Sequence, residues 1–323
     1  MSDRDLRCPA PSGLVRPVPV DPDGRTGPTT GQARGPFWRR SSPRLYVPAG
    51  ADRDIVEQRI LEESMRLPAG GAVTGWAALR LAGAGFLDGV APDGCTVLDV
   101  PLLLPPGRDI RRGAGFTVRR ERIDDRELTA FHGIPCTVPL RAVFDEVRGL
   151  EDLRERVVVI DMAVGARLIQ LPVLTAYVAN KAGWPHVRRA LAALPLADVR
   201  SRSPQETRLR LIWVLDAGLP RPRCNWPIAD AHGVFIGKPD LLCEELAVVG
   251  EFDGVEHRSR RRHQIDVRRD DRFRRAGLEC FHVVGADLTE VPLVVDRIRA
   301  AVERAGTSGI PRAWRVRRDP GPV

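Results

Sequence analysis

The chain has 323 residues, with 50 lysines and arginines against 42 aspartates and glutamates and a formal net charge of +8. This length suffices for two ordinary domains, each with its own hydrophobic core. The first thirty residues lack the apolar core of a signal peptide, and no later apolar run reaches membrane-spanning length. We therefore expect a cytoplasmic protein without a membrane partner, and the positive charge makes nucleic acid the first candidate partner.

Two residue types narrow the chemistry. The six cysteines are scattered without a C-x-x-C pair, which predicts reduced thiols in a cytosolic protein rather than a disulfide framework or a zinc site. Only two of the basic residues are lysines, Lys181 and Lys238. The chain therefore offers few candidates for a catalytic lysine.

Composition and periodicity predict two α/β domains between two flexible ends. Residues 1–44 are rich in proline, glycine and arginine, and we expect them to be mostly flexible, with a short strand pair from Phe37 to Pro48. A mixed α+β module is expected over 45–197 and an α/β domain over 198–305. Residues 306–323 are expected to form a basic flexible tail.

The 45–197 module offers little chemistry in its sequence. A helix is predicted to begin at Pro139, because the apolar residues that follow recur at the spacing of a buried helical stripe. His132, Asp145 and Glu146 are isolated polar residues, and we interpret them as surface or capping groups.

The second domain is predicted to begin with a helix at Ser203. Serine is a good N-cap, proline suits the first helical position, and Glu206 falls at the capping-box position. Glu206 also shares a helical face with Leu209 and Trp213, so its carboxylate could equally point along the buried side toward a sheet. The two interpretations are compatible, and both stay open.

Acidic residues gather at the ends of two predicted strands between Ile236 and His257. The first strand carries Asp240, and the second contains an apolar run typical of a strand covered on both faces. That run ends in Glu251 and Asp253, which alternation places on the same face. Buried carboxylates at adjacent strand ends need a positive partner. Mg²⁺ with oxygen ligands is one answer and an arginine or lysine partner is the other, and the sequence leaves both open.

The stretch after the second strand is strongly basic. Between Gly254 and Arg275 the sequence has nine arginines and only four acidic residues. This stretch contains a predicted helix that ends at Gly277. A solvated face with i, i+4 ion pairs would explain this pattern, but we favour a surface that follows a phosphate backbone. The candidate nucleic-acid contacts are Arg258, Arg261, Arg262, Arg268, Arg269 and Arg272.

Four short segments occur in an order that resembles the Vsr-like nucleases. They are S-P-x-E-T-R, P-D-L, E-F-D-G-x-x-H and R-R-D-D-x-x-R-R-A-G-L, and the resemblance covers residues 203–300. Vsr-like nucleases are relatives of very-short-patch-repair endonucleases in the PD-(D/E)XK superfamily. The resemblance implies a restriction-endonuclease-like, three-layer domain with a mixed central sheet.

Residues 45–195 are similar to a module associated with AbiEi-type antitoxins, through the segments R-L-Y-V-P and G-I-P-C-T-V-P-L-R-A-V-F-D. This combination of domains is common in actinobacteria. It implies an antitoxin-like role and a toxin-like protein partner. In that family a winged helix-turn-helix usually precedes the module, and residues 1–44 show no helix pair that would form one.

The resemblance also implies a metal site. Asp240 and Glu251 would bind Mg²⁺ or Mn²⁺, and Glu206 would complete the set of metal ligands. Asp253 occupies the position where many superfamily members carry a lysine.

The same resemblance implies a general base and a reaction. His257 is the matching general-base candidate, because an imidazole suits proton abstraction from water at neutral pH. Lys238, two residues before Asp240, is the alternative. The implied activity is metal-dependent hydrolysis of DNA phosphodiesters, as in an endonuclease. A catalytically inactive, DNA-binding regulator or antitoxin-like protein with the same fold is the alternative.

Overall fold

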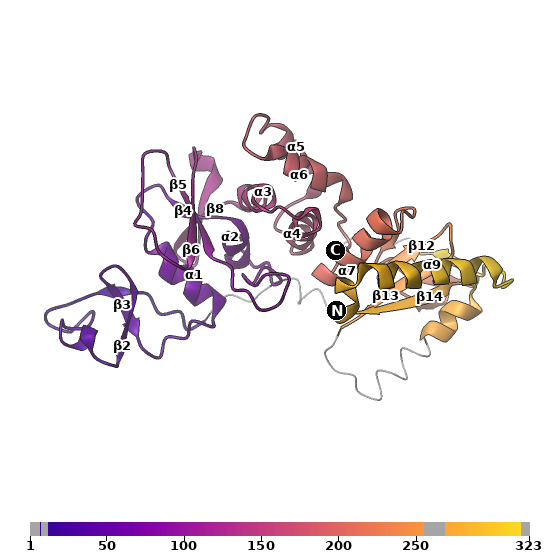
Figure 1. Ribbon diagram of the computed structural model, residues 1–323, viewed down its shortest axis with the longest axis horizontal. Helices are drawn as coiled ribbons and strands as arrows, with labels where there is room; N and C mark the ends of the chain where they lie inside the picture. The colour runs from indigo at the N-terminus through magenta and orange to yellow at the C-terminus, as the bar shows by residue number, and fades with distance from the viewer. Residues whose placement is uncertain (1–6, 8–11, 255–268, 318–323) are drawn as a thin grey trace. The chain divides into compact units, whose positions relative to one another are not determined.

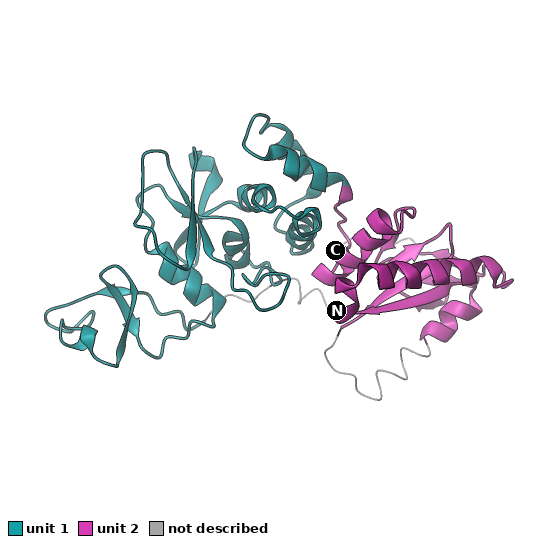
Figure 2. Ribbon diagram, viewed as in Figure 1, with its two compact units in different colours: residues 1–195 teal, residues 196–323 magenta. Residues whose placement is uncertain are grey.

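The computed structural model describes Arg7, residues 12–254 and residues 269–317 (Figure 1). The fold is mixed α/β, with parallel and antiparallel strand pairs in its larger sheets. The chain divides into two compact units, residues 1–195 and 196–323 (Figure 2). Within the described residues, the helices fall short of the length and apolarity that crossing a bilayer demands.

Unit 1 is built on a mixed sheet of five strands in the order β6-β5-β4-β8-β7. The strands are β4 (Ala72–Val73), β5 (Val100–Leu104), β6 (Phe116–Arg120), β7 (Leu128–Phe131) and β8 (Ile134–Thr137). The helices are α1 (Val56–Ser64), α2 (Gly75–Leu81), α3 (Pro139–Gly149), α4 (Leu153–Gly165), α5 (Leu171–Ala179) and α6 (Val187–Ala193). The predicted helix from Pro139 is confirmed, and its apolar stripe is buried.

The N-terminal segment differs from the expected flexible arm. Within residues 12–48 it forms a small antiparallel sheet of β1 (Val18–Pro19), β3 (Leu45–Pro48) and β2 (Trp38–Ser42). It is also held to α1, because the Gln58 side chain accepts from the backbone N–H of Val15 at 2.8 Å and donates to its carbonyl at 2.9 Å. The strand pair predicted from Phe37 to Pro48 is confirmed as β2 and β3. β1 and the contact with α1 were missed because their partners lie outside residues 1–44.

Asp145 is not the surface group that its isolation in the sequence suggested. It is buried, and its carboxylate receives Arg141 Nε at 2.9 Å, Arg148 Nη2 at 2.7 Å and the Thr74 hydroxyl at 2.7 Å. Two arginines on the same helix therefore neutralise it inside the core. Glu146 does act as a capping group, because it accepts the backbone N–H of Trp76 at the start of α2, at 2.9 Å.

Unit 2 contains a mixed sheet of four strands in the order β14-β13-β12-β9. The strands are β9 (Arg223–Cys224), β12 (Leu241–Cys243), β13 (Val248–Asp253) and β14 (Glu279–Val284). β13 pairs parallel with β14 and antiparallel with β12. This arrangement agrees with the mixed central sheet expected for this part of the chain.

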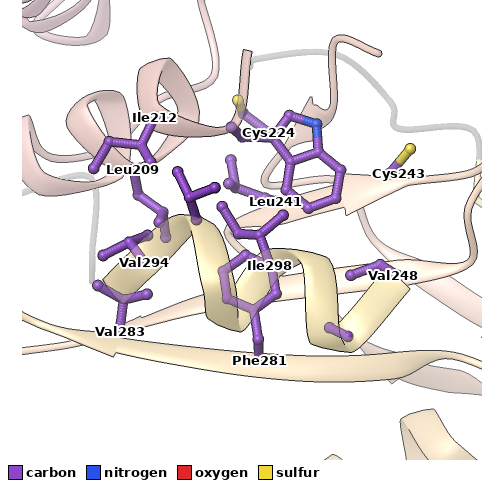
Figure 3. Close-up of a cluster of buried hydrophobic side chains, with 13 residues drawn as sticks. Leu209, Ile212, Cys224, Leu241, Cys243, Val248, Phe281, Val283, Val294 and Ile298 are labelled. Atoms are coloured by element: carbon purple, nitrogen blue, oxygen red, sulfur yellow. The ribbon is translucent and has the colours of Figure 1, made fainter. Parts of the chain in front are cut away.

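Both faces of this sheet are covered, as the apolar run in β13 predicted. One face packs on α7 (Pro204–Leu211), the π-helical turn η4 (Ile212–Asp216) and α9 (Val291–Thr307) (Figure 3). Trp213 lies at the centre of this layer, with its ring stacked on Phe281 at 5.9 Å. The opposite face packs on Phe273, which belongs to a helix described from residue 269 to 275, and on Ile228.

The C-terminal tail also differs from expectation. A hairpin forms from β10 (Ile228–Asp230) and β11 (Phe235–Gly237), and the tail adds β15 (Trp314–Val316) to the free edge of β10. The result is a second, three-stranded sheet, β11-β10-β15. An exposed strand edge offers unpaired backbone groups, and the basic tail satisfies them.

The lack of a side chain at Gly250 on β13 leaves room for the Phe281 ring of the neighbouring strand β14. A Cβ atom at this position would lie 2.5 Å from Cζ of Phe281. We expect Gly250→Ala to lower the free energy of unfolding by roughly 1–3 kcal/mol through overpacking, measured by urea denaturation. The matched control is Gly254→Ala, where nothing lies within 4 Å. Equal stability of the two variants would contradict this account of the core.

Candidate functional site

Asp240 and Glu251 lie side by side where β12 and β13 meet. Leu241 pairs with Gly250, so the antiparallel register places the residue before Leu241 opposite Glu251. The backbone N–H of Phe252 donates to Asp240 Oδ2 at 2.8 Å, which ties the two strands together at this point. Burial, and secondly the charge of Glu206, raise the pKa of Asp240 to about 7.

Glu251 is the most deeply buried carboxylate of the site, with 3% of its surface exposed. Its Oε2 forms an ion pair with Arg269 Nη2 at 2.8 Å. Arg269 is therefore the arginine partner that the sequence had left open. Its Oε1 is buried without a hydrogen-bond partner among the described residues. Burial and the neighbouring Asp240 raise the pKa of Glu251 well above its ordinary value, although Arg269 opposes the shift. The pair therefore remains short of positive charge.

Glu206 has both of the roles that its position suggested, as a residue of the helix cap and as a buried side chain near the sheet. Its backbone N–H donates to the Ser203 hydroxyl at 3.1 Å, so Ser203 caps the helix, and its Oε2 accepts the backbone N–H of Arg202, the residue before the cap, at 2.9 Å. Its side chain is buried, accepts the Asn225 amide at 2.7 Å and lies close enough to Asp240 to raise the pKa of that group. The Glu206 oxygens are thus already used by three donors, since the Ser203 hydroxyl also donates to Oε1 at 3.1 Å.

A three-carboxylate metal site is not assembled in the part of the chain that the structure describes. No group of three or more aspartate, glutamate, histidine or cysteine side chains there is placed to hold a metal ion. The role of Glu206 as a third metal ligand therefore stays a prediction. Asp240 and Glu251 alone fit Mg²⁺ or Mn²⁺, because Mg²⁺ is usually held by one or two carboxylates together with water and substrate phosphate. The partnerless, buried Oε1 of Glu251 is the observation that supports this fit.

His282 is a site residue that the sequence analysis missed. It lies on β14, opposite Glu251 in the parallel register. Its Nδ1 lies 3.2 Å from Asp253 Oδ2, and its Nε2 lies 2.8 Å from Asp270 Oδ2. These hydrogen bonds, that to Asp253 first, raise the pKa of His282 to about 10, so its imidazolium adds a positive charge near Glu251. Asp253 is accordingly a partner of His282. Alternation along β14 could have placed His282 on this face, but the register with β13 is tertiary information.

The remaining predicted residues are only partly described. Lys238 is exposed directly after β11. Of the predicted arginines, Arg269 reaches Glu251, and Arg272 is exposed on the outer side of its helix. The predicted residues that lie outside the described part of the chain are His257, Arg258, Arg261, Arg262 and Arg268.

No protein-family model matches the chain, and no similar curated protein or solved structure was found. The resemblances to Vsr-like nucleases and to the AbiEi-associated module therefore stay predictions.

The raised pKa of Asp240 predicts a pH dependence of stability in the absence of metal. Its ordinary pKa is 3.8 and its folded pKa is about 7, so the folded state binds the proton more tightly. This contribution to stability is fully present below about pH 4 and is lost as the pH rises to about 7. We expect Asp240→Asn to exceed the wild type by roughly 1–2 kcal/mol at pH 8, with a much smaller difference at pH 5.

The measurement is urea denaturation at both pH values in the presence of a chelator, with Asp271→Asn, an exposed residue on the neighbouring helix, as the control. A variant less stable than the wild type at pH 8 would show that the Asp240 charge is already neutralised in the fold.

Proposed function

We propose that unit 2 is a metal-dependent endonuclease domain that hydrolyses DNA phosphodiesters. One observation carries the proposal: the partly buried Asp240 lies opposite the buried Glu251, and one Glu251 oxygen has no hydrogen-bond partner among the described residues. Such a pair is unfavourable in an apolar interior unless a cation joins it. The resemblance to Vsr-like nucleases supplies the reaction class.

Each residue of the site has a distinct task in this proposal. Bound Mg²⁺ or Mn²⁺ would polarise a phosphoryl oxygen and lower the pKa of a coordinated water molecule. Asp240 and Glu251 would hold the ion, and the Phe252 N–H orients the Asp240 carboxylate for this task. The His282 imidazolium offsets part of the negative charge. His257, or alternatively Lys238, is the proposed base.

The substrate is proposed from charge. The helix that carries Arg269 presents Arg272, Arg274 and Arg275 to solvent, while Phe273 is buried beneath them. Exposed arginines at this spacing suit a phosphate backbone, and binding through them weakens as salt increases. The choice of DNA, and a toxin-like partner for unit 1, rest on the resemblances alone.

A second candidate function is favoured by the ion pair between Arg269 and Glu251. In an inactive, DNA-binding regulator, this arginine would take the place of the metal permanently. The three hydrogen bonds that Glu206 accepts, from Arg202, Ser203 and Asn225, fit the same alternative.

Plasmid cleavage separates the two candidates. We expect the wild type to cut supercoiled DNA with Mg²⁺ or Mn²⁺, and Asp240→Asn or Glu251→Gln to cut roughly 100-fold less or worse, because each removes a metal ligand. Retention of DNA in a gel-shift assay without metal should survive both substitutions.

Asp271→Asn serves as the control and should cut like the wild type. A wild type that retains DNA but never cuts it would support the regulator. Cutting that persists in Asp240→Asn would instead indicate a contaminating nuclease.

A further inference from the structure

The ion pair between Arg269 and Glu251 differs in geometry from the pair between Arg39 and Glu62. Its shortest contact joins Arg269 Nη2 to Glu251 Oε2 at 2.8 Å. By contrast, Arg39 donates two parallel hydrogen bonds to Glu62, from Nη1 to Oε2 at 2.8 Å and from Nη2 to Oε1 at 2.7 Å. A forked contact of that kind is what stabilises a structural pair.

Both members of the Arg269–Glu251 pair retain unused polar atoms. Arg269 Nε and Glu251 Oε1 are buried and have no hydrogen-bond partner among the described residues. A second contact between them would satisfy both atoms, and the fold does not make it. The net gain of this pair is therefore small, because each group loses water without full compensation.

The position of Arg269 gives its guanidinium access to a second anion. Its side chain is 27% exposed, whereas the Glu251 side chain is 4% exposed. The described part of its helix is held independently, because the next residue, Asp270, is bonded to His282 at 2.8 Å. Arg269 can therefore exchange its anion by a change of side-chain rotamer without moving the helix.

We propose that Arg269 is a substrate-operated latch, which occupies Glu251 in the free protein and transfers to a DNA phosphate when DNA binds. The transfer frees Glu251 Oε2 beside the partnerless Oε1 and brings the full carboxylate to the cation. DNA and the divalent cation then bind with positive coupling, and by linkage each raises the affinity for the other by the same factor. This inference rests on the proposed metal site and specifies how that site is regulated.

The coupling is measured by titrating Mn²⁺ into the protein and following free Mn²⁺ by electron paramagnetic resonance, with and without a short DNA duplex. For the wild type we expect DNA to raise Mn²⁺ affinity about tenfold or more. In Arg269→Gln, Mn²⁺ should bind more tightly without DNA, and the enhancement by DNA should largely disappear.

Arg299→Gln is the matched control, because it removes the same charge from an exposed position of α9, on the opposite face of the sheet from the arginines proposed to bind DNA. It should keep the enhancement of the wild type. Asp240→Asn should abolish Mn²⁺ binding in both conditions, which identifies the site that is being titrated. The integrity of the duplex is checked on a gel after each titration.

If DNA raises the Mn²⁺ affinity equally in the wild type and in Arg269→Gln, the latch is overturned. The proposed function survives that result, because the loss of a positive charge alone changes Mn²⁺ affinity alike with and without DNA. Absence of Mn²⁺ binding in every condition would overturn the proposed function as well. If Arg269→Gln does not fold, arginine side-chain NMR of the wild type provides the test. The Arg269 signal should then change only when DNA and Mg²⁺ are both present, and an unchanged signal would contradict the latch.

Discussion

The constraint on which unit 2 depends is a pair of carboxylates, the buried Glu251 and the partly buried Asp240, placed beside Arg269. Asp240 and Glu251 lose much of their hydration at the strand ends, and their mutual repulsion adds to that loss. Arg269 offsets only part of it, through one of the two Glu251 oxygens. A fold selected for stability alone would favour a forked arginine or an apolar pair here. The two carboxylates therefore still lack enough positive charge, which indicates a cationic ligand.

The rest of the unit brings these two side chains together and holds them there. The register of β12 with β13 sets them opposite each other, and Gly250 lets β13 approach the aromatic core beneath it. On the other side, His282 joins β14 to the helix that carries Arg269. The site is therefore supported by regular elements, which suits a function that needs fixed geometry.

The sequence predicted the parts of this arrangement that depend on local interactions. The cap at Ser203 follows from the chemistry of one helical turn, and the face shared by Glu251 and Asp253 follows from strand alternation. Residues whose roles depend on distant partners were missed. Asp145 is buried against the Thr74 hydroxyl, 71 residues away in the sequence, and His282 needed the parallel register of β13 with β14. The strand at 314–316 was missed for the same reason, since its partner β10 lies far away in the sequence.

The most direct measurement is an anomalous diffraction map from crystals of the protein with a short DNA duplex and Mn²⁺. The account predicts a manganese peak within about 2.0–2.6 Å of oxygens from both Asp240 and Glu251, with the Arg269 guanidinium on a DNA phosphate. A map without a peak at these carboxylates, in which Arg269 still contacts Glu251, would contradict the metal site and leave a DNA-binding role without cleavage.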